Sequence, residues 1–508
     1  MGFSSLDYLV LALYLIGVTV FGTLFRRTQR TVKDYFIGTR NTHWLVISLS
    51  IVATETSSLT LIGVPAIAYG TYARPELGGS LTYLQVVLGY IVARVIISFL
   101  FIPAYFQGDL VTAYELLHRR FGPRAKHFAA SLFVVMRAFA DGVRVFAASL
   151  VAAAVIGSSL PGFPDLWLWS VVIVGALTLV YTFEGGVAAV IWTDLIQLVV
   201  YVVGSLLAAW QLLTLVPGGW ATVAADGAAA GKFQLWSFSW DWSLPFTFWA
   251  GLIGGTFLTM ASHGTDQLLV QRLLTCRNER DGQKALIASG FIVLGQFLLF
   301  LLVGVMLYSY YQHAPLPKLT TNDEIFPAFI VAHLPSGIAG LMIAAIFAAA
   351  MSTMSGSLNS LASTTIFDFY KPLARGPVDD ARLLRLSRWA TAAWGVVLIL
   401  IALAARDWGS VFVAGLSIAS LVYGPLLGAF LLGVLTRRTT EAGVMIGIGT
   451  SLACMLLVWL RTPLAWTWYV LAGTSICVVV GYAASVAAGA GTGRARGGPP
   501  DAPPPAAR

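Results

Sequence analysis

Long apolar stretches, separated by short breaks that carry charged, proline or glycine residues, run through almost the whole chain. A helix needs roughly 20 apolar residues to cross a bilayer, and thirteen stretches approach or exceed that length. They lie near residues 6–25, 43–70, 79–106, 128–156, 165–185, 189–215, 246–272, 282–312, 336–369, 389–405, 410–435, 441–460 and 465–487. Because a chain in hydrocarbon must satisfy its backbone hydrogen bonds internally, the sequence predicts an all-α polytopic membrane protein with about 13 helices.

The composition excludes a water-soluble protein. Of the 508 residues, 58% are hydrophobic and 11% are charged, whereas soluble domains carry about 25% charged residues. The first apolar stretch has no basic residue before it and no small-residue cleavage site, so we interpret it as a retained helix and not as a signal peptide. The three cysteines are too widely spaced for a metal-binding or redox motif.

The basic residues are distributed unevenly between the two sides of the predicted membrane. Counted over alternate loops, 23 lysines and arginines fall on one side and 5 on the other, while Arg94, Arg137 and Arg144 lie inside spans. Basic loops stay in the cytoplasm. This predicts a plasma or inner membrane protein with its amino terminus outside and its carboxyl terminus in the cytoplasm. The net charge of +8 therefore orients the chain and does not indicate a nucleic-acid partner.

Two of the apolar stretches are interrupted by polar residues. The first interruption, at residues 48–63, contains Glu55 among several hydroxyl residues, and the second, at residues 254–267, contains His263 and Asp266 among glycines. Ionisable side chains are costly in hydrocarbon unless they face a cavity or a partner. Broken helices in corresponding positions of two halves indicate a transporter built from inverted repeats, whose unwound backbone lines a central site.

The two interruptions lie five spans apart, and this odd offset inverts the topology of the second half. The predicted organisation is a leading helix and cytoplasmic loop (1–42), a first five-helix repeat (43–215), an extracellular loop (216–245), a second five-helix repeat (246–435), two trailing helices (436–487) and a disordered cytoplasmic tail (488–508).

The eighth helix of the predicted five-plus-five core combines small residues with hydroxyl side chains between residues 344 and 360. Most such hydroxyls bond their own backbone or a neighbouring helix. Ser352 and Thr353, however, follow Ala349 by one turn, and can present two hydroxyl oxygens and a carbonyl to the first interrupted helix. Uncharged oxygen ligands of this kind suit a monovalent cation that must also be released.

At these residues the sequence resembles the sodium:solute symporter family, through essentially the whole membrane portion, from the leading helix to the thirteenth span. The motifs that carry the resemblance are GGVAAVIWTDLIQ at 185–197, DQLLVQR at 266–272, AAMSTMS at 349–355 and LNS at 358–360. The resemblance implies a LeuT-like core of five plus five helices and sodium-coupled symport of a small organic solute. It also implies a sodium site formed by the backbone of Ala53, Thr56 and Ala349 and the hydroxyls of Ser352 and Thr353.

The resemblance leaves two further roles open. Asp194 and Ser355 match residues that bind a second sodium in some relatives, but the next position is Gly356, which has no side-chain ligand. Asp194 can instead pair with a basic residue of an inner gate. Glu55 either tunes the sodium site or contacts substrate, or else makes a gating or structural hydrogen bond.

For the solute, the resemblance implies that six side chains face the central cavity: Ser57, Thr60, Gln85, Thr259, Ser262 and Ser417. Sugar-carrying members have an aromatic residue where this chain has Ser262 and a lysine where it has Val293. An organic acid or a sialic-acid-like solute is therefore favoured. Arg137 and Arg144 can add positive charge to the cavity, although Arg137 and Asp141 are spaced to pair with each other. His263 is interpreted either as a proton sensor or as a hydrogen-bonded packing residue.

No hydrolase, metalloprotease or P-loop motif occurs in the sequence, so we expect neither an enzyme nor an ATP-driven pump. Proton-coupled transport, and a transporter-derived channel or sensor, remain the alternatives. The expected partners are the solute, sodium as the coupling ion and the lipid bilayer, with no organic cofactor. One subunit is sufficient for such a site, and an oligomer is not excluded.

Overall fold

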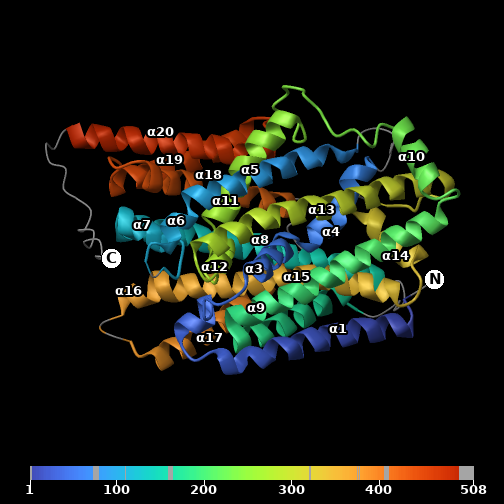
Figure 1. Cartoon of the computed structure of the whole chain (residues 1–508), viewed down its shortest axis with the longest axis horizontal. Coiled ribbons are helices and arrows are strands. Elements are labelled where there is room, and N and C mark those ends of the chain that lie inside the picture. Colours follow the sequence, from blue (N-terminus) through green and yellow to red (C-terminus); the bar gives the residue numbers. More distant parts are fainter. Residues whose placement is uncertain are drawn as a thin grey trace, which may run out of the picture.

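The computed structural model describes residues 3–71, 79–108, 110–157, 164–319, 322–374, 376, 378–405 and 411–490. In these residues the regular structure is helical throughout, and an isolated bridge between Thr42 and Cys276 is the single β-type pairing. The long helices lie side by side along one axis, and α1 begins at the end of the bundle opposite to the one where α20 ends (Figure 1). The predicted tail, from residue 491 onward, lies outside the described residues.

The first predicted repeat contains α3 (Trp44–Glu55), α4 (Ser58–Tyr69), α5 (Leu84–Leu100), α8 (Pro123–Gly157) and α9 (Leu166–Leu215). The second contains α11 (Gly255–Gly264), α12 (Gln267–Leu273), α13 (Glu279–His313), α15 (Ile338–Thr364), α17 (Asp380–Ala404) and α18 (Val411–Leu435). Helices α1 (Ser5–Thr23), α19 (Glu441–Arg461) and α20 (Tyr469–Ala490) flank them. The shorter elements include α2 (Val32–Ile37), α6 (Ile102–Phe106), α7 (Tyr114–Arg120), α10 (Trp220–Ala229), α14 (Ile325–His333), α16 (Lys371–Leu373), and two π-helical turns, η3 (Ala250–Gly254) and η5 (Thr365–Tyr370).

Within the described residues, eight helices are long and apolar enough to cross a membrane, or nine when the bent pair α3 and α4 is counted as one span. Helix α9 runs through two predicted spans, 165–185 and 189–215, and is kinked at Gly186 (φ 52°, ψ −148°). The total of thirteen crossings stays a prediction.

Both predicted helix interruptions are present. Helix α3 ends at Glu55, α4 begins at Ser58, and the two meet at a bend of 68°. Thr56 between them has an extended backbone (φ −83°, ψ 97°), and Ser57 caps α4 by accepting a hydrogen bond from the Thr60 amide. In the second repeat, α11 ends at Gly264, and Asp266 caps α12 by accepting from the Leu268 amide (2.9 Å).

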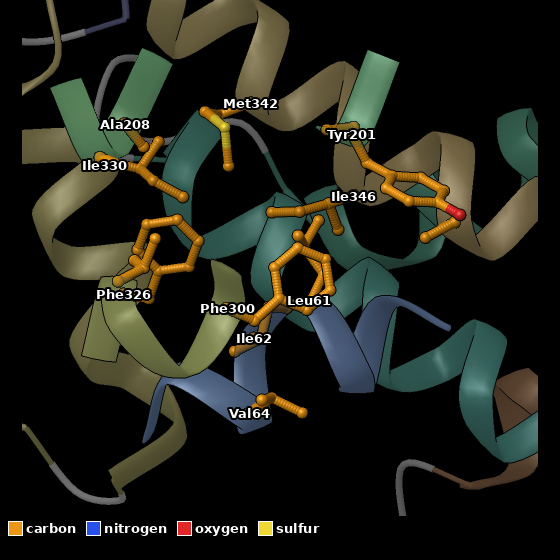
Figure 2. Close-up of a cluster of buried hydrophobic side chains, with 14 of the residues drawn as sticks. Leu61, Ile62, Val64, Tyr201, Ala208, Phe300, Phe326, Ile330, Met342 and Ile346 are labelled. Atoms are coloured by element: carbon orange, nitrogen blue, oxygen red, sulfur yellow. The ribbon is translucent and has the colours of Figure 1, made fainter. Parts of the chain in front are cut away.

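Helix α15 lies at the centre of the bundle, and every residue from Met342 to Thr364 is buried. Its small side chains allow close approach of α9, α8, α1 and α3. One half of α15 packs in an apolar cluster with α4, α9, α13 and α14 (Figure 2). The labelled members are Leu61, Ile62, Val64, Tyr201, Ala208, Phe300, Phe326, Ile330, Met342 and Ile346. This packing fixes the bent pair α3 and α4 against α15, whose hydroxyl-rich half follows directly in the sequence.

Candidate ion and solute site

A buried carboxylate, that of Asp194, connects three of the helices around the first break. Its Oδ1 accepts a hydrogen bond from Ser352 of α15 (2.7 Å). Its Oδ2 accepts from Ser50 (2.5 Å) and Thr54 (3.2 Å) of α3. Asp194 itself belongs to α9, so α3, α9 and α15 are held together at one point.

The five residues predicted to bind sodium are all buried: Ala53, Thr56, Ala349, Ser352 and Thr353. They come from α3, the break that follows it, and α15, and these two helices pack against each other. Because α3 ends at Glu55, the Ala53 carbonyl belongs to the last turn, where carbonyls lack intrahelical partners.

The two hydroxyl groups of the predicted sodium site are oriented by the hydrogen bonds that they donate. Ser352 donates to Asp194, and Thr353 donates to the Ala349 carbonyl (3.1 Å). A hydroxyl that donates its proton elsewhere keeps oxygen lone pairs available for a cation. The Thr56 hydroxyl also belongs to this network, since it donates to the Val52 carbonyl (2.9 Å) and accepts from Gln296 of α13 (2.7 Å).

Arg272 of α12 reaches the same carboxylate. Its Nη2 donates to Asp194 Oδ2 (3.0 Å), its Nε to Ser50 (3.1 Å) and its Nη1 to the Leu268 carbonyl (2.8 Å). Arg272 lies at the end of a predicted span, and its side chain is only 3% exposed. Of the two roles left open for Asp194, the ion pair with a basic residue is therefore present.

A second buried cluster contains Glu55, Arg94 and His263. Glu55, at the end of α3, forms an ion pair with Arg94 of α5. The His263 Nε2 atom of α11 lies 3.1 Å from Arg94 Nη2 and 3.5 Å from Glu55 Oε2. Since arginine can only donate, Nε2 is the acceptor, which places the imidazole proton on Nδ1, 2.9 Å from the Ser262 hydroxyl. His263 therefore makes the hydrogen-bonded packing contacts that were one of its two interpretations.

The sequence did not predict this cluster. From the sequence, Arg94 is only a charge inside a span. The signal that could have found it is that an ionisable residue in the middle of an apolar helix needs a partner at the same depth.

The predicted pairing of Arg137 with Asp141 is confirmed, with a distance of 3.3 Å between Nη1 and Oδ2. Arg137 also forms an ion pair with Asp266 at the second break and donates to the Tyr423 hydroxyl of α18 (2.8 Å). Arg144 is bound to the other oxygen of Asp141 (2.7 Å), and its side chain is 25% exposed. Of Arg137 and Arg144, Arg144 is thus the more accessible to a ligand.

The residues predicted to face the solute occupy different environments. Ser57 and Thr60 lie together at the start of α4, with their hydroxyl oxygens 3.3 Å apart. Thr259 is buried in α11, and Ser262 is partly exposed beside His263. The side chain of Ser417 lies outside the described residues.

Gln85 is one of the residues predicted to face the solute, but both polar atoms of its side chain form hydrogen bonds with other parts of the protein. Its Oε1 accepts from the Ser237 amide (3.0 Å), and its Nε2 donates to the carbonyls of Phe246 and Thr82 (both 3.1 Å). Ser237 and Phe246 belong to the aromatic segment between α10 and α11, which also contains Trp236, Phe238, Trp240, Trp242, Phe248 and Trp249. The structure therefore gives Gln85 a role in holding that segment on α5.

In the part of the chain that the structure describes, the charges of the ion pairs around the two breaks balance. Four carboxylates, those of Glu55, Asp141, Asp194 and Asp266, are each in an ion pair with arginine, and four arginines take part, Arg94, Arg137, Arg144 and Arg272. Buried charges need such partners, because an uncompensated one carries a large desolvation cost.

A family model described as the sodium:solute symporter family matches residues 35–450. The chain belongs to this family. The symporter is 32% identical over 490 residues to the sodium/sialic acid symporter NanT of Aliivibrio fischeri, an alignment that covers 94% of this chain and 93% of that protein. It is 29% identical over 481 residues to the human sodium/iodide cotransporter, covering 91% and 71% of the two chains.

Solved structures agree with this assignment. The symporter superposes on a Na+-coupled sialic acid symporter that was solved in a substrate-bound outward-open state with a novel Na+ site. The TM-score is 0.85 and the sequence identity is 28%, and the superposition covers 95% of this chain and 98% of the other. It also shares its fold with MHP1, a nucleobase-cation-symport-1 family transporter, with a TM-score of 0.58, 14% identity and coverage of 90% and 95%. The LeuT-like fold, the multi-pass membrane location and sodium as the coupling ion, all expected from the sequence, are confirmed.

Proposed function

We propose that this symporter imports a small organic anion, an organic acid or a sialic-acid-like solute, together with sodium by alternating access. The observation that supports an anionic solute is the charge balance around the two helix breaks. Sodium alone adds a positive charge to a neutral buried region, and an anion alone adds a negative one. When the two bind together the region stays neutral, so each ligand lowers the cost of burying the other. The 32% identity to a sodium/sialic acid symporter supports the same solute class.

We place the sodium ion among Ala53, Thr56, Ala349, Ser352 and Thr353. An ion there bridges the first helix break and α15, and orders two elements that would otherwise separate. A solute that binds next to it then loses less conformational entropy, which gives positive coupling between the two ligands.

The solute lies, on this proposal, along the polar side chains nearest the breaks. Ser57 and Thr60 supply neutral hydroxyls from α4, and Thr259 and Ser262 supply them from α11. Ser417 completes the predicted set from α18, and Gln85 acts through the segment that it holds. Glu55 lies next to Thr56 and tunes the sodium site through its ion pair with Arg94, without being one of the five ligands.

The topology is part of the proposal. The amino terminus lies outside and the carboxyl terminus in the cytoplasm, supported by the basic loops and by the opposite ends of the bundle at which α1 begins and α20 ends (Figure 1). The two five-helix repeats of the proposed organisation are those predicted from the sequence, residues 43–215 and 246–435. Because every proposed ligand comes from one chain, a single subunit suffices for transport.

The test is uptake of radiolabelled sialic acid and of a monocarboxylate into proteoliposomes, driven by an inward sodium gradient or by a potassium gradient of the same size. We expect accumulation of at least one of these anions only with sodium. Equal uptake in the two gradients would refute sodium-driven import of that solute. Uptake that follows a pH gradient instead would support proton coupling.

A further inference from the structure

A cavity of about 400 Å³ lies at the end of the bundle that the proposed topology places in the cytoplasm. Its walls come from four parts of the chain: α2, α7 with the residues just before it, the start of α8, and η5 with α16. Helices α7 and α16 lie at the end of the bundle where α20 ends (Figure 1). Sites for small molecules typically have volumes of roughly 300–1,000 Å³, so the cavity is large enough to hold a ligand.

The ionisable side chains that line this cavity are mostly basic. Three lysines and two histidines face one carboxylate, that of Glu115. The basic residues are Lys33, Lys126, Lys371, His118 and His127. Lysine ammonium groups bind phosphate as point charges, and an imidazole can donate a hydrogen bond to it. The lining therefore suits an anionic ligand.

Lys126 fixes the buried side of the cavity. Its Nζ donates to Glu115 Oε2 (2.8 Å) and to the Phe367 carbonyl (3.3 Å), and it lies 3.1 Å from Asp368 Oδ1. The same Asp368 oxygen accepts a hydrogen bond from Thr112 (2.7 Å). These contacts compensate the charge of Lys126 and hold α7, α8 and η5 together. Lys126 therefore sets the shape of the cavity, and the positive charge for a ligand comes from the other two lysines.

Those two lysines are exposed to solvent and belong to α2 and α16. Among the described residues, the Lys371 ammonium contacts the ring of Phe367, at 5.6 Å from the ring centroid, and no carboxylate. The His127 ring stacks on that of Phe369, with 6.0 Å between the centroids. The rim of the cavity thus combines positive charge with aromatic surface.

The cavity lies at the depth of lipid headgroups. Lys126 comes just before the predicted span at 128–156, and Lys371 comes just after the one at 336–369. Leu373, which follows Lys371 in α16, is 77% exposed. Basic residues at the cytoplasmic end of a span lie close to the phosphates of the inner leaflet, and an exposed leucine beside them suits contact with acyl chains.

We propose that this cavity binds a phosphate group, which is carried by an anionic lipid of the cytoplasmic leaflet or by a soluble phosphate. Basic pockets between membrane helices on the cytoplasmic side are known to hold anionic lipid headgroups. A phosphate there would connect α2, α8 and α16 through their basic side chains. The inference goes beyond sodium-coupled transport, because none of the lining residues belongs to the proposed sodium or solute site. It uses the proposed topology only to name the leaflet.

The first experiment separates the two sources of phosphate. Binding of radiolabelled inorganic phosphate to the full-length protein is measured in detergent at constant sodium and ionic strength. The melting temperature is then compared in nanodiscs of phosphatidylcholine with and without phosphatidylglycerol. Saturable phosphate binding alone would indicate a soluble ligand, and a higher melting temperature with phosphatidylglycerol would indicate the lipid headgroup. If neither is observed, the inference is wrong.

The second experiment locates the ligand. Lys33→Gln combined with Lys371→Gln removes the two exposed lysines of the cavity. The matched control, Arg437→Gln combined with Arg438→Gln, removes two exposed basic residues of the loop between α18 and α19, on the same side of the membrane.

We expect the lysine variant to weaken phosphate binding by about tenfold, or to abolish the preference for phosphatidylglycerol, because two positive charges leave the ligand. The arginine variant should behave like the wild type. Equal losses in the two variants would show a general attraction of anions to the basic surface and would overturn the inference. Unchanged binding in the lysine variant would overturn it as well.

Discussion

Glu55 and Arg94 form a buried ion pair that joins the end of α3 to the middle of α5. The Arg94 side chain is fully buried, and that of Glu55 is 14% exposed. His263 of α11 lies against both groups. Together the three groups connect the first helix break to α11, the helix that ends at the second break, next to the proposed sodium ligand Thr56.

We predict that Arg94→Gln destabilises the protein strongly. Removing one partner of a buried ion pair leaves an uncompensated charge and costs about 3–5 kcal/mol. The melting temperature of the purified protein should therefore fall clearly in Arg94→Gln and recover in large part when Glu55→Gln is added. Equal losses in the single and double variants would show that the two charges do not compensate each other.

We predict that Ser352→Ala combined with Thr353→Ala raises the sodium concentration needed for half-maximal uptake by tenfold or more. The variant removes two of the five proposed oxygen ligands, and each tenfold loss in affinity corresponds to about 1.4 kcal/mol. The matched control is Ser360→Ala on the same helix, where the buried hydroxyl donates to the Ser357 carbonyl (3.1 Å). A wild-type sodium response in the double variant would reject the site.

We predict that Gln85→Leu loosens the aromatic segment between α10 and α11. The substitution removes the hydrogen bonds to the Ser237 amide and the Phe246 carbonyl, each with a net value of about 0.5–1.5 kcal/mol. Hydrogen exchange at residues 234–249 should become faster. Gln234→Leu, which loses only an exposed bond to the Trp236 carbonyl, is the control. Unchanged exchange in Gln85→Leu would return Gln85 to a role in solute contact alone.

The parts of this protein that were predictable from sequence are those set by local pattern. Apolar length located the helices, and polar residues in apolar stretches located both breaks, because hydrocarbon does not tolerate them without a structural reason. The ion pairs were harder to predict, since pairing depends on which helices pack together. The sequence places Arg272 at the end of an apolar stretch, and only the packing of α12 brings its side chain to Asp194. Arg137 and Asp141 were predictable because their spacing on one helix is itself a contact.

We predict that Gly186→Ala destabilises the protein, whereas Gly295→Ala does not. Gly186 kinks α9 with a positive φ of 52°, and a Cβ atom there would lie 2.5 Å from the Tyr35 carbonyl oxygen. Both the backbone conformation and the contact exclude a side chain, so we expect a loss of at least about 1 kcal/mol. Gly295 lies in the interior of α13, and apart from the backbone of its own helix no atom lies within 4 Å of the position that a Cβ would take. Alanine there should therefore be neutral or stabilise by up to about 1 kcal/mol. Thermal unfolding of the two variants measures the difference, and equal melting temperatures would contradict the kink at Gly186.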